Sequence, residues 1–265
     1  MTAVLGIILL SDLFPFVSAI RANWGTPLIH ALSWALAAWL GWAGVVATQS
    51  YLGMEAPALR WLALALTGCA GMAVLGARRP GAGAWHFVVL ALLAILLLPL
   101  GQARGDVPLH PVWIALLAAA AAVIPFNYLP TRLGPAALAL AVGCGLETAA
   151  LVVSRDALGE LVTGARLLVA LSPWIGWALL KSRRPARSEF DRLWVGFRDR
   201  YGLTWSLRTQ EQFNRSAANA DWTSRLGWRG LRGSSCHQVE EQMALRALLK
   251  RFSAPAGPGA KDEAC

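Results

Sequence analysis

The sequence predicts an all-α protein: a polytopic transmembrane helix bundle of six or seven spans, followed by a small helical cytoplasmic C-terminal domain. The 265 residues are 56% hydrophobic and only 15% charged, with a mean hydropathy of +0.49, whereas soluble domains carry about 25% charged residues. Several apolar stretches reach the roughly 20 residues that a spanning helix needs. Charge collects at the end of the chain, since residues 1–180 have net charge +2 and residues 181–265 have +7.

Six stretches are long and apolar enough to be predicted as spans: residues 28–49, 61–77, 84–101, 111–129, 134–153 and 163–180. Thr26 and Pro27 suit the start of the first of these, as a capping residue and a first helical residue. Arg166 lies about one turn into the last, where we expect its long side chain to snorkel to the membrane surface. The tryptophans expected at the membrane interface are Trp61, Trp85, Trp113 and Trp177.

Residues 3–20 are predicted to form a seventh, irregular span. The stretch is apolar but is interrupted by Asp12 and Pro15, and it lacks the basic start of a secretory signal. A re-entrant or interfacial segment is the alternative.

Basic residues predict that the C-terminus is cytoplasmic. A hinge at residues 182–187 follows the last span, and its basic neighbourhood is expected to contact anionic lipid through Lys181, Arg183, Arg184 and Arg187. The inside loops then hold Arg21, Arg78, Arg79 and Arg132, and the outside loops hold Arg60, Arg104 and Arg155. The Ala-, Arg- and Gly-rich composition is typical of a bacterial cytoplasmic (inner) membrane protein.

Glu147 is the main candidate for function inside the membrane. It lies in the stretch GCGLETAAL, well inside its predicted span, and an ionisable group at that depth usually faces the bundle interior. A packing role for a hydrogen-bonded glutamate is the alternative. Asp12 is a second candidate if its segment spans, because Pro15 nearby could create a broken-helix site.

Prolines within two spans are expected to kink their helices and leave carbonyl groups without partners. Asn127 follows Pro125, and Ser172 precedes Pro173. Both polar side chains are therefore predicted to satisfy freed carbonyls.

Cofactor and metal signals are weak. His30 and His86 lie at similar depth near the cytoplasmic ends of their spans and could share an axial haem, but neither stands in a haem-attachment motif. No cofactor is therefore predicted, with haem as an alternative. No metal site is predicted, because the cysteines, Cys69, Cys144, Cys236 and Cys265, lack metal-binding spacing. No catalytic motif is found, which favours a protein that is not an enzyme.

The region 188–252 is predicted to be a small helical domain. Its first helix covers residues 188–201, with Ser188 as N-cap and Gly202 just past the end. A second helix is expected over residues 204–220, a loop over 221–233, and a third helix beginning with a capping box at Ser235. Residues 253–265 are predicted to be disordered.

The first of these helices presents an aromatic face that we expect to pack within the domain or dock a cytoplasmic protein partner. Its large residues recur at helical spacing, and the docking candidates are Phe190, Trp194, Phe197 and Tyr201. Acidic and basic residues alternate here without a continuous basic stripe, so no nucleic-acid binding is expected.

Three functions are compatible with these features. The first is a non-enzymatic membrane subunit that docks a cytoplasmic partner through residues 188–252. The second is a small-molecule or ion transporter that uses Glu147, and the third is a haem-binding redox protein that uses His30 and His86.

Overall fold

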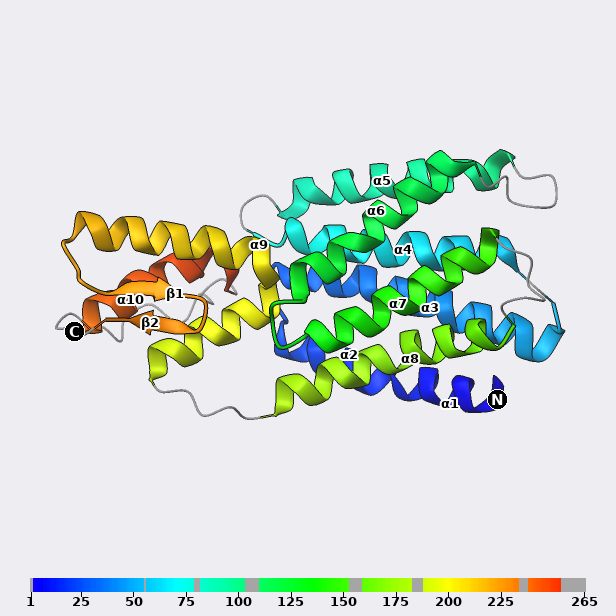
Figure 1. Ribbon diagram of the computed structural model, residues 1–265, viewed down its shortest axis with the longest axis horizontal. Helices are drawn as coiled ribbons and strands as arrows, with labels where there is room; N and C mark the ends of the chain where they lie inside the picture. Colours follow the sequence, from blue (N-terminus) through cyan, green and yellow to red (C-terminus); the bar gives the residue numbers. More distant parts are fainter. Residues whose placement is uncertain are drawn as a thin grey trace.

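The structure is a helical bundle with a smaller C-terminal segment at one end (Figure 1). This computed structural model describes residues 2–54, 56–78, 82–102, 110–152, 159–182, 188–233 and 238–253. Within them, 7 stretches are long and apolar enough to cross a membrane, which fits a multi-pass membrane protein. The N-terminal stretch is one of the seven, as predicted.

The bundle consists of α1 (Thr2–Ser11), α2 (Leu13–Ala22), α3 (Leu28–Leu52), α4 (Pro57–Leu75), α5 (Ala82–Gln102), α6 (Pro111–Tyr128), α7 (Gly134–Val152) and α8 (Gly159–Lys181). Helices α1 and α2 form one span that is broken at Asp12. Pro15 accounts for the break, because it lacks the N–H that would bond to the Ser11 carbonyl. The interrupted apolar helix predicted for this stretch is present, and it is long enough to span a membrane.

Helix α4 lies at the centre of the bundle, with 67% of its span buried inside the protein. It packs against α3, α5, α6 and α7. Two glycines allow α6 to approach closely: a Cβ atom at Gly71 would lie 2.6 Å from Ile124 Cγ1, and one at Gly68 would lie 2.9 Å from Ala120 Cβ. Small residues at a helix contact are typical of bundles within membranes.

Helix α4 begins earlier than the sequence predicted. Pro57 occupies its first turn, where proline is favoured because its missing N–H has no helical partner in any case. Arg60 is therefore part of the helix and is buried, so its prediction as an outside-loop residue is wrong. Trp61 is also buried rather than interfacial, and its Nε1 donates to the Leu96 carbonyl at 2.6 Å.

The C-terminal segment (residues 188–253) contains α9 (Glu189–Asn219), β1 (Arg225–Gly227), β2 (Gly230–Arg232), α10 (Gln238–Leu249) and the 3₁₀ turn η2 (Lys250–Phe252). The Ser188 cap is confirmed, since its Oγ accepts from the Asp191 N–H at 3.0 Å. Helix α9 leaves helical geometry at Gly202, which confirms the predicted break. The capping box at Ser235 lies outside the described residues.

One part of this segment was predicted wrongly. The expected loop over 221–233 contains an antiparallel hairpin in which Leu226 pairs with Leu231 and Gly227 with Gly230. Leu226 is almost completely buried, and its burial stabilises the hairpin. The strands were missed because they are very short and helical periodicity does not reveal them. The protein is therefore predominantly, but not entirely, α-helical.

The aromatic face of α9 lies in the interior. The side chains of Phe190, Trp194, Phe197 and Tyr201 are between 0% and 6% exposed. They belong to a hydrophobic cluster that runs from the C-terminal segment into the bundle, and Phe252 closes it by packing against Phe197 and Tyr201. The chain itself covers the face, so the docking hypothesis loses the exposed surface on which it rested.

A joint at Gly202 holds the C-terminal segment against the bundle. Gly202 has φ +76° and ψ −167°, and on either side of it α9 is bonded to one side chain of α6. Asn127 accepts from the Thr204 N–H at 3.0 Å and donates to the Tyr201 carbonyl at 3.4 Å. Asn127 therefore bridges the two halves of α9 instead of serving the kink at Pro125.

Replacing Gly202 with alanine is expected to destabilise this joint. The backbone conformation is one that only glycine adopts readily, at a cost of about 1–3 kcal/mol for other residues. A Cβ atom there would also overlap the Asn127 side chain, which would have to shift. Gly202→Ala should lower the thermal unfolding midpoint in detergent and speed proteolytic release of the C-terminal segment.

Gly196→Ala provides the matched control, because Gly196 lies in the same helix and a Cβ atom there meets nothing within 4 Å. Alanine at this helical position should leave stability unchanged or raise it by up to about 1 kcal/mol. Equal stability of Gly202→Ala and the native protein would contradict the role assigned to the joint.

Candidate functional site

Glu147 lies at the centre of a buried polar cluster contributed by four helices. Its partners are Arg60 in α4, Arg166 in α8 and, through Arg166, Gln49 in α3. We call these four residues the Arg–Glu–Arg cluster. Glu147 is 0% exposed, Arg60 3% and Arg166 5%, so the three charged groups are removed from solvent.

The carboxylate of Glu147 binds one arginine through each oxygen. Arg60 Nε and Nη2 lie 2.8 and 2.7 Å from Oε2, and Arg60 Nη2 also reaches the Glu147 main-chain oxygen at 3.3 Å. Arg166 Nε lies 2.7 Å from Oε1, and Arg166 Nη1 donates to Gln49 Oε1. Such charge-assisted hydrogen bonds are about twice as strong as neutral ones.

Local sequence explains why these groups meet. Gly143 lies one turn before Glu147, and a Cβ atom at Gly143 would be 2.7 Å from the Ala165 carbonyl oxygen. Because glycine lets α7 and α8 approach this closely, the residue after Ala165 reaches Glu147. Arg60 comes from the first turn of α4, while Gln49 lies in the last turn of α3. The cluster therefore lies near the end of the bundle opposite the C-terminal segment (Figure 1).

Sequence reasoning identified Glu147 correctly as an interior residue but missed its partners. Arg166 was expected to snorkel to the surface and is instead buried in an ion pair. The sequence did hold a signal for this pairing. Arg60 and Arg166 carry the opposite charge to Glu147, and all three lie at similar distances from the same membrane face. Asn127, a further candidate, lies at the Gly202 joint and belongs to a different part of the molecule.

The described side chains leave the cluster with an excess positive charge, because two guanidinium groups face one carboxylate. Burying a charge is costly unless it is paired and hydrogen-bonded. Each guanidinium carries five N–H donors, and neither Arg60 Nη1 nor Arg166 Nη2 donates to another residue within the described ranges. This arrangement suits an anion with two or more acceptor oxygens.

Asp12 is a second buried acid, and it lies deeper in the bundle. It is 0% exposed, and neither oxygen has a hydrogen-bond partner among the described residues. The facing indole of Trp39 donates to the Leu9 carbonyl at 3.1 Å. Next to Asp12, Ser11 accepts from Trp174 Nε1 at 3.1 Å. Trp174 stands eight residues beyond Arg166, so Asp12 lies about 12 Å deeper than the cluster.

The two histidines proposed as haem ligands contact each other directly. His86 Nε2 lies 2.7 Å from His30 Nδ1, and Trp34 Nε1 donates to His86 Nδ1 at 3.3 Å. Metal–imidazole bonds are roughly 2 Å long, so an iron bound on both sides would require the rings to separate. Haem ligation stays a prediction, tested by the Soret absorbance of the purified protein. Within the described residues, no group of three or more metal-binding side chains is found.

The remaining candidate residues are the four predicted lipid-surface residues and the serine next to Pro173. Of the lipid-surface residues, Lys181 ends α8, and its Nζ lies 4.4 Å from the centre of the Trp177 ring. Arg183, Arg184 and Arg187 lie outside the described residues. Ser172 donates to the Val169 carbonyl at 2.8 Å, the group that Pro173 leaves without its helical partner, so this prediction is confirmed.

Comparison with protein-family models, curated proteins and solved structures finds no match to this chain. The class of the protein therefore follows from its own geometry: the seven apolar helices fit a multi-pass membrane protein, and its most unusual site is a buried cluster of three charged groups.

Removing the acid of the cluster is expected to destabilise the protein strongly. Glu147→Gln leaves two buried guanidinium groups without their counter-charge, and breaking a buried ion pair in this way costs about 3–5 kcal/mol. Arg166→Gln should cost less, because the Arg60–Glu147 pair remains. The double variant Glu147→Gln/Arg166→Gln should be more stable than Glu147→Gln alone. Thermal unfolding of the four proteins in detergent tests this order.

Glu211→Gln is the matched control, since Glu211 is 69% exposed and pairs with Arg215 on the surface. This change should alter stability by less than about 0.5 kcal/mol. Native-like stability of Glu147→Gln would show that the cluster does not hold the helices together.

Proposed function

We propose that this protein binds and transports a small anionic solute through the Arg–Glu–Arg cluster. The observation that carries the proposal is the presence of two buried arginines against one buried glutamate, contributed by three different spans. Ionisable groups within spanning helices are costly, and they commonly mark substrate or ion pathways.

The excess positive charge favours an anion over a cation or a neutral solute. A planar guanidinium group binds carboxylate and phosphate oxygens through paired N–H donors. Arg166 is the better candidate for contacting the solute, because it makes one bond to Glu147 while Arg60 makes two to the carboxylate and one to the main chain. Small carboxylates and phosphates are therefore the expected solute classes.

Asp12 supports a path that continues beyond the cluster. A buried carboxyl group without a hydrogen-bond partner is rare and calls for an explanation. It lies at the break between α1 and α2, and broken helices form solute and ion sites in transporters. We propose that Asp12 is a second polar site for the solute, on the path toward the end of the bundle that carries the C-terminal segment.

A solute that binds only the native state stabilises it by RT ln(1 + [L]/Kd), where [L] is the free solute concentration, and so raises its unfolding midpoint. At least one small carboxylate or phosphate should therefore raise the unfolding midpoint of the native protein and enter proteoliposomes that contain it. Arg166→Gln should abolish both effects while the protein remains folded. Arg166→Lys should retain a weakened response, because lysine keeps the positive charge but lacks the paired N–H donors of the guanidinium group.

Arg215→Gln, at an arginine that is 73% exposed, controls for the general loss of a positive charge. The proposal fails if no anion in a panel of carboxylates and phosphates stabilises the native protein. It also fails if Arg166→Gln and the native protein respond identically to the anion that does.

We propose that the C-terminal segment faces the cytoplasm of a bacterial cell and that the cluster lies nearer the outer face of its cytoplasmic membrane. The described basic residues at the C-terminal end of the bundle support this orientation by the positive-inside rule; they are Arg21, Arg78, Arg132 and Lys181. An epitope placed after residue 253 should resist protease added to intact spheroplasts and become cleavable once the membrane is permeabilised. Cleavage in intact spheroplasts would reverse the orientation.

A further inference from the structure

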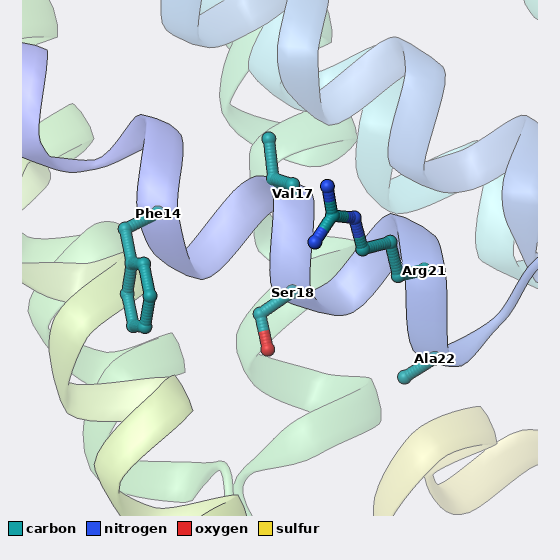
Figure 2. Close-up of a pocket in the computed structure, with 5 residues that line it drawn as sticks. All are labelled: Phe14, Val17, Ser18, Arg21 and Ala22. Atoms are coloured by element: carbon teal, nitrogen blue, oxygen red, sulfur yellow. The ribbon is translucent and has the colours of Figure 1, made fainter.

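One face of α2 lines a hollow near the end of the bundle that carries the C-terminal segment. Its residues follow the helical repeat i, i+3, i+4, i+7 and i+8, and Figure 2 shows them on neighbouring turns of α2: Phe14, Val17, Ser18, Arg21 and Ala22. The hollow has a volume of about 490 Å³, which is in the range of small-molecule sites.

The deeper part of the hollow is apolar and open to the surroundings of the bundle. Phe14 is 56% exposed and Val17 40%. On its other side, Phe14 stacks on Trp174 with ring centres 5.9 Å apart and meets the edge of Trp177 at 5.4 Å. These contacts fix α2 against α8 and leave an aromatic and aliphatic surface for a hydrocarbon chain.

The shallower part of the hollow is polar and basic. Within the described residues, no acidic side chain pairs with Arg21, and Figure 2 shows its guanidinium group lying back along α2 toward Val17 and Ser18. Helices α2 and α8 run in parallel, as the first and last spans. Because Ser11 contacts Trp174 and Phe14 contacts Trp177, the parallel register places Ser18 near the level of Lys181.

Trp177, which contacts Phe14, has an indole N–H without a partner among the described residues. Its Nε1 atom is buried. The Lys181 ammonium lies over the same ring, and indoles in this position commonly occur at the level of lipid headgroups.

We propose that the hollow binds one anionic phospholipid. Its phosphate lies between Arg21 and Lys181 with the Ser18 hydroxyl beside it, and one acyl chain runs along Val17 and Phe14. The basic groups match the headgroup charge, and the order along α2, from Arg21 and Ser18 to Val17 and Phe14, matches the order of groups along a phospholipid. This site is separate from the Arg–Glu–Arg cluster, and neither proposal depends on the other.

Native mass spectrometry of the full-length protein tests this site. The protein is titrated with phosphatidylglycerol and, separately, with phosphatidylcholine that carries the same acyl chains. The native protein should retain one phosphatidylglycerol in preference to phosphatidylcholine. Arg21→Gln and Lys181→Gln should each weaken its binding about fivefold, and the double variant about thirtyfold, since each basic residue near a membrane surface contributes about that factor.

Two further variants separate this site from general attraction of the lipid to positive charge. Arg200→Gln removes an exposed arginine at the same end of the protein and should leave binding unchanged. Val17→Trp fills the hollow without altering charge and should weaken phosphatidylglycerol binding at least tenfold. Unfolding midpoints of all variants should match that of the native protein, because every changed side chain lies at the surface.

Three results would overturn the proposal: equal retention of the two lipids, equal weakening by Arg200→Gln, or unchanged binding in the Arg21→Gln/Lys181→Gln variant. Glycerol phosphate, tested alone, identifies the source of the phosphate group. If the native protein retains glycerol phosphate as well as it retains phosphatidylglycerol at equal concentration, the acyl chain plays no part in binding. The ligand is then a soluble phosphate, and the lipid proposal is also overturned.

Discussion

Hydrogen bonds from tryptophan indoles to main-chain carbonyls hold the parts of this structure together. Several of these carbonyls lie in the last turns of helices or in turns, where the usual i→i+4 partners are missing. Those of Leu9 and Val74 also accept from the Asp12 and Ala77 N–H groups. Trp85 and Trp205 serve the end of α4, and Trp228 serves the connection after α6. The indole–carbonyl bonds are Trp39 to Leu9, Trp61 to Leu96, Trp85 to Met72, Trp194 to Trp228, Trp205 to Val74 and Trp228 to Pro130.

These bonds explain why the C-terminal segment and the bundle share a hydrophobic interior. Trp205 reaches from α9 to α4, and Asn127 reaches from α6 to α9 across the Gly202 joint. Trp205 gives the Val74 carbonyl, which also accepts from the Ala77 N–H, a second donor at the point where the aromatic residues of α9 exclude water. Two of the tryptophans predicted to lie at the membrane interface, Trp61 and Trp85, therefore donate hydrogen bonds to main-chain carbonyls of neighbouring helices.

The features predicted from the sequence depend on local pattern, and the features missed depend on distant pairing. Span length, the break at Asp12 and the break at Gly202 each follow from residues within a few positions. The partners of Glu147 lie 87 and 19 residues away, and no periodicity links them. Arg60 was misplaced because the start of α4 was taken from hydropathy, whereas Pro57 begins the helix. The hairpin was missed because its strands have only 3 residues each.

Helix α4 connects the Arg–Glu–Arg cluster to the C-terminal segment, and under the proposed transport function this connection limits how the helices can move. Arg60 lies in its first turn, while the carbonyls of Met72 and Val74 in its last turn are bonded to Trp85 and Trp205. Moving α4 would break both of those bonds, at about 1 kcal/mol each or more where the carbonyl is left buried. Helix α8 carries Arg166 and is interrupted by Pro173, where the helical ladder already lacks a bond. If a solute draws Arg166 away from Glu147 as proposed, the missing ladder bond at Pro173 is the point at which the Arg166 end of α8 is expected to bend, whereas α4 has no proline inside it.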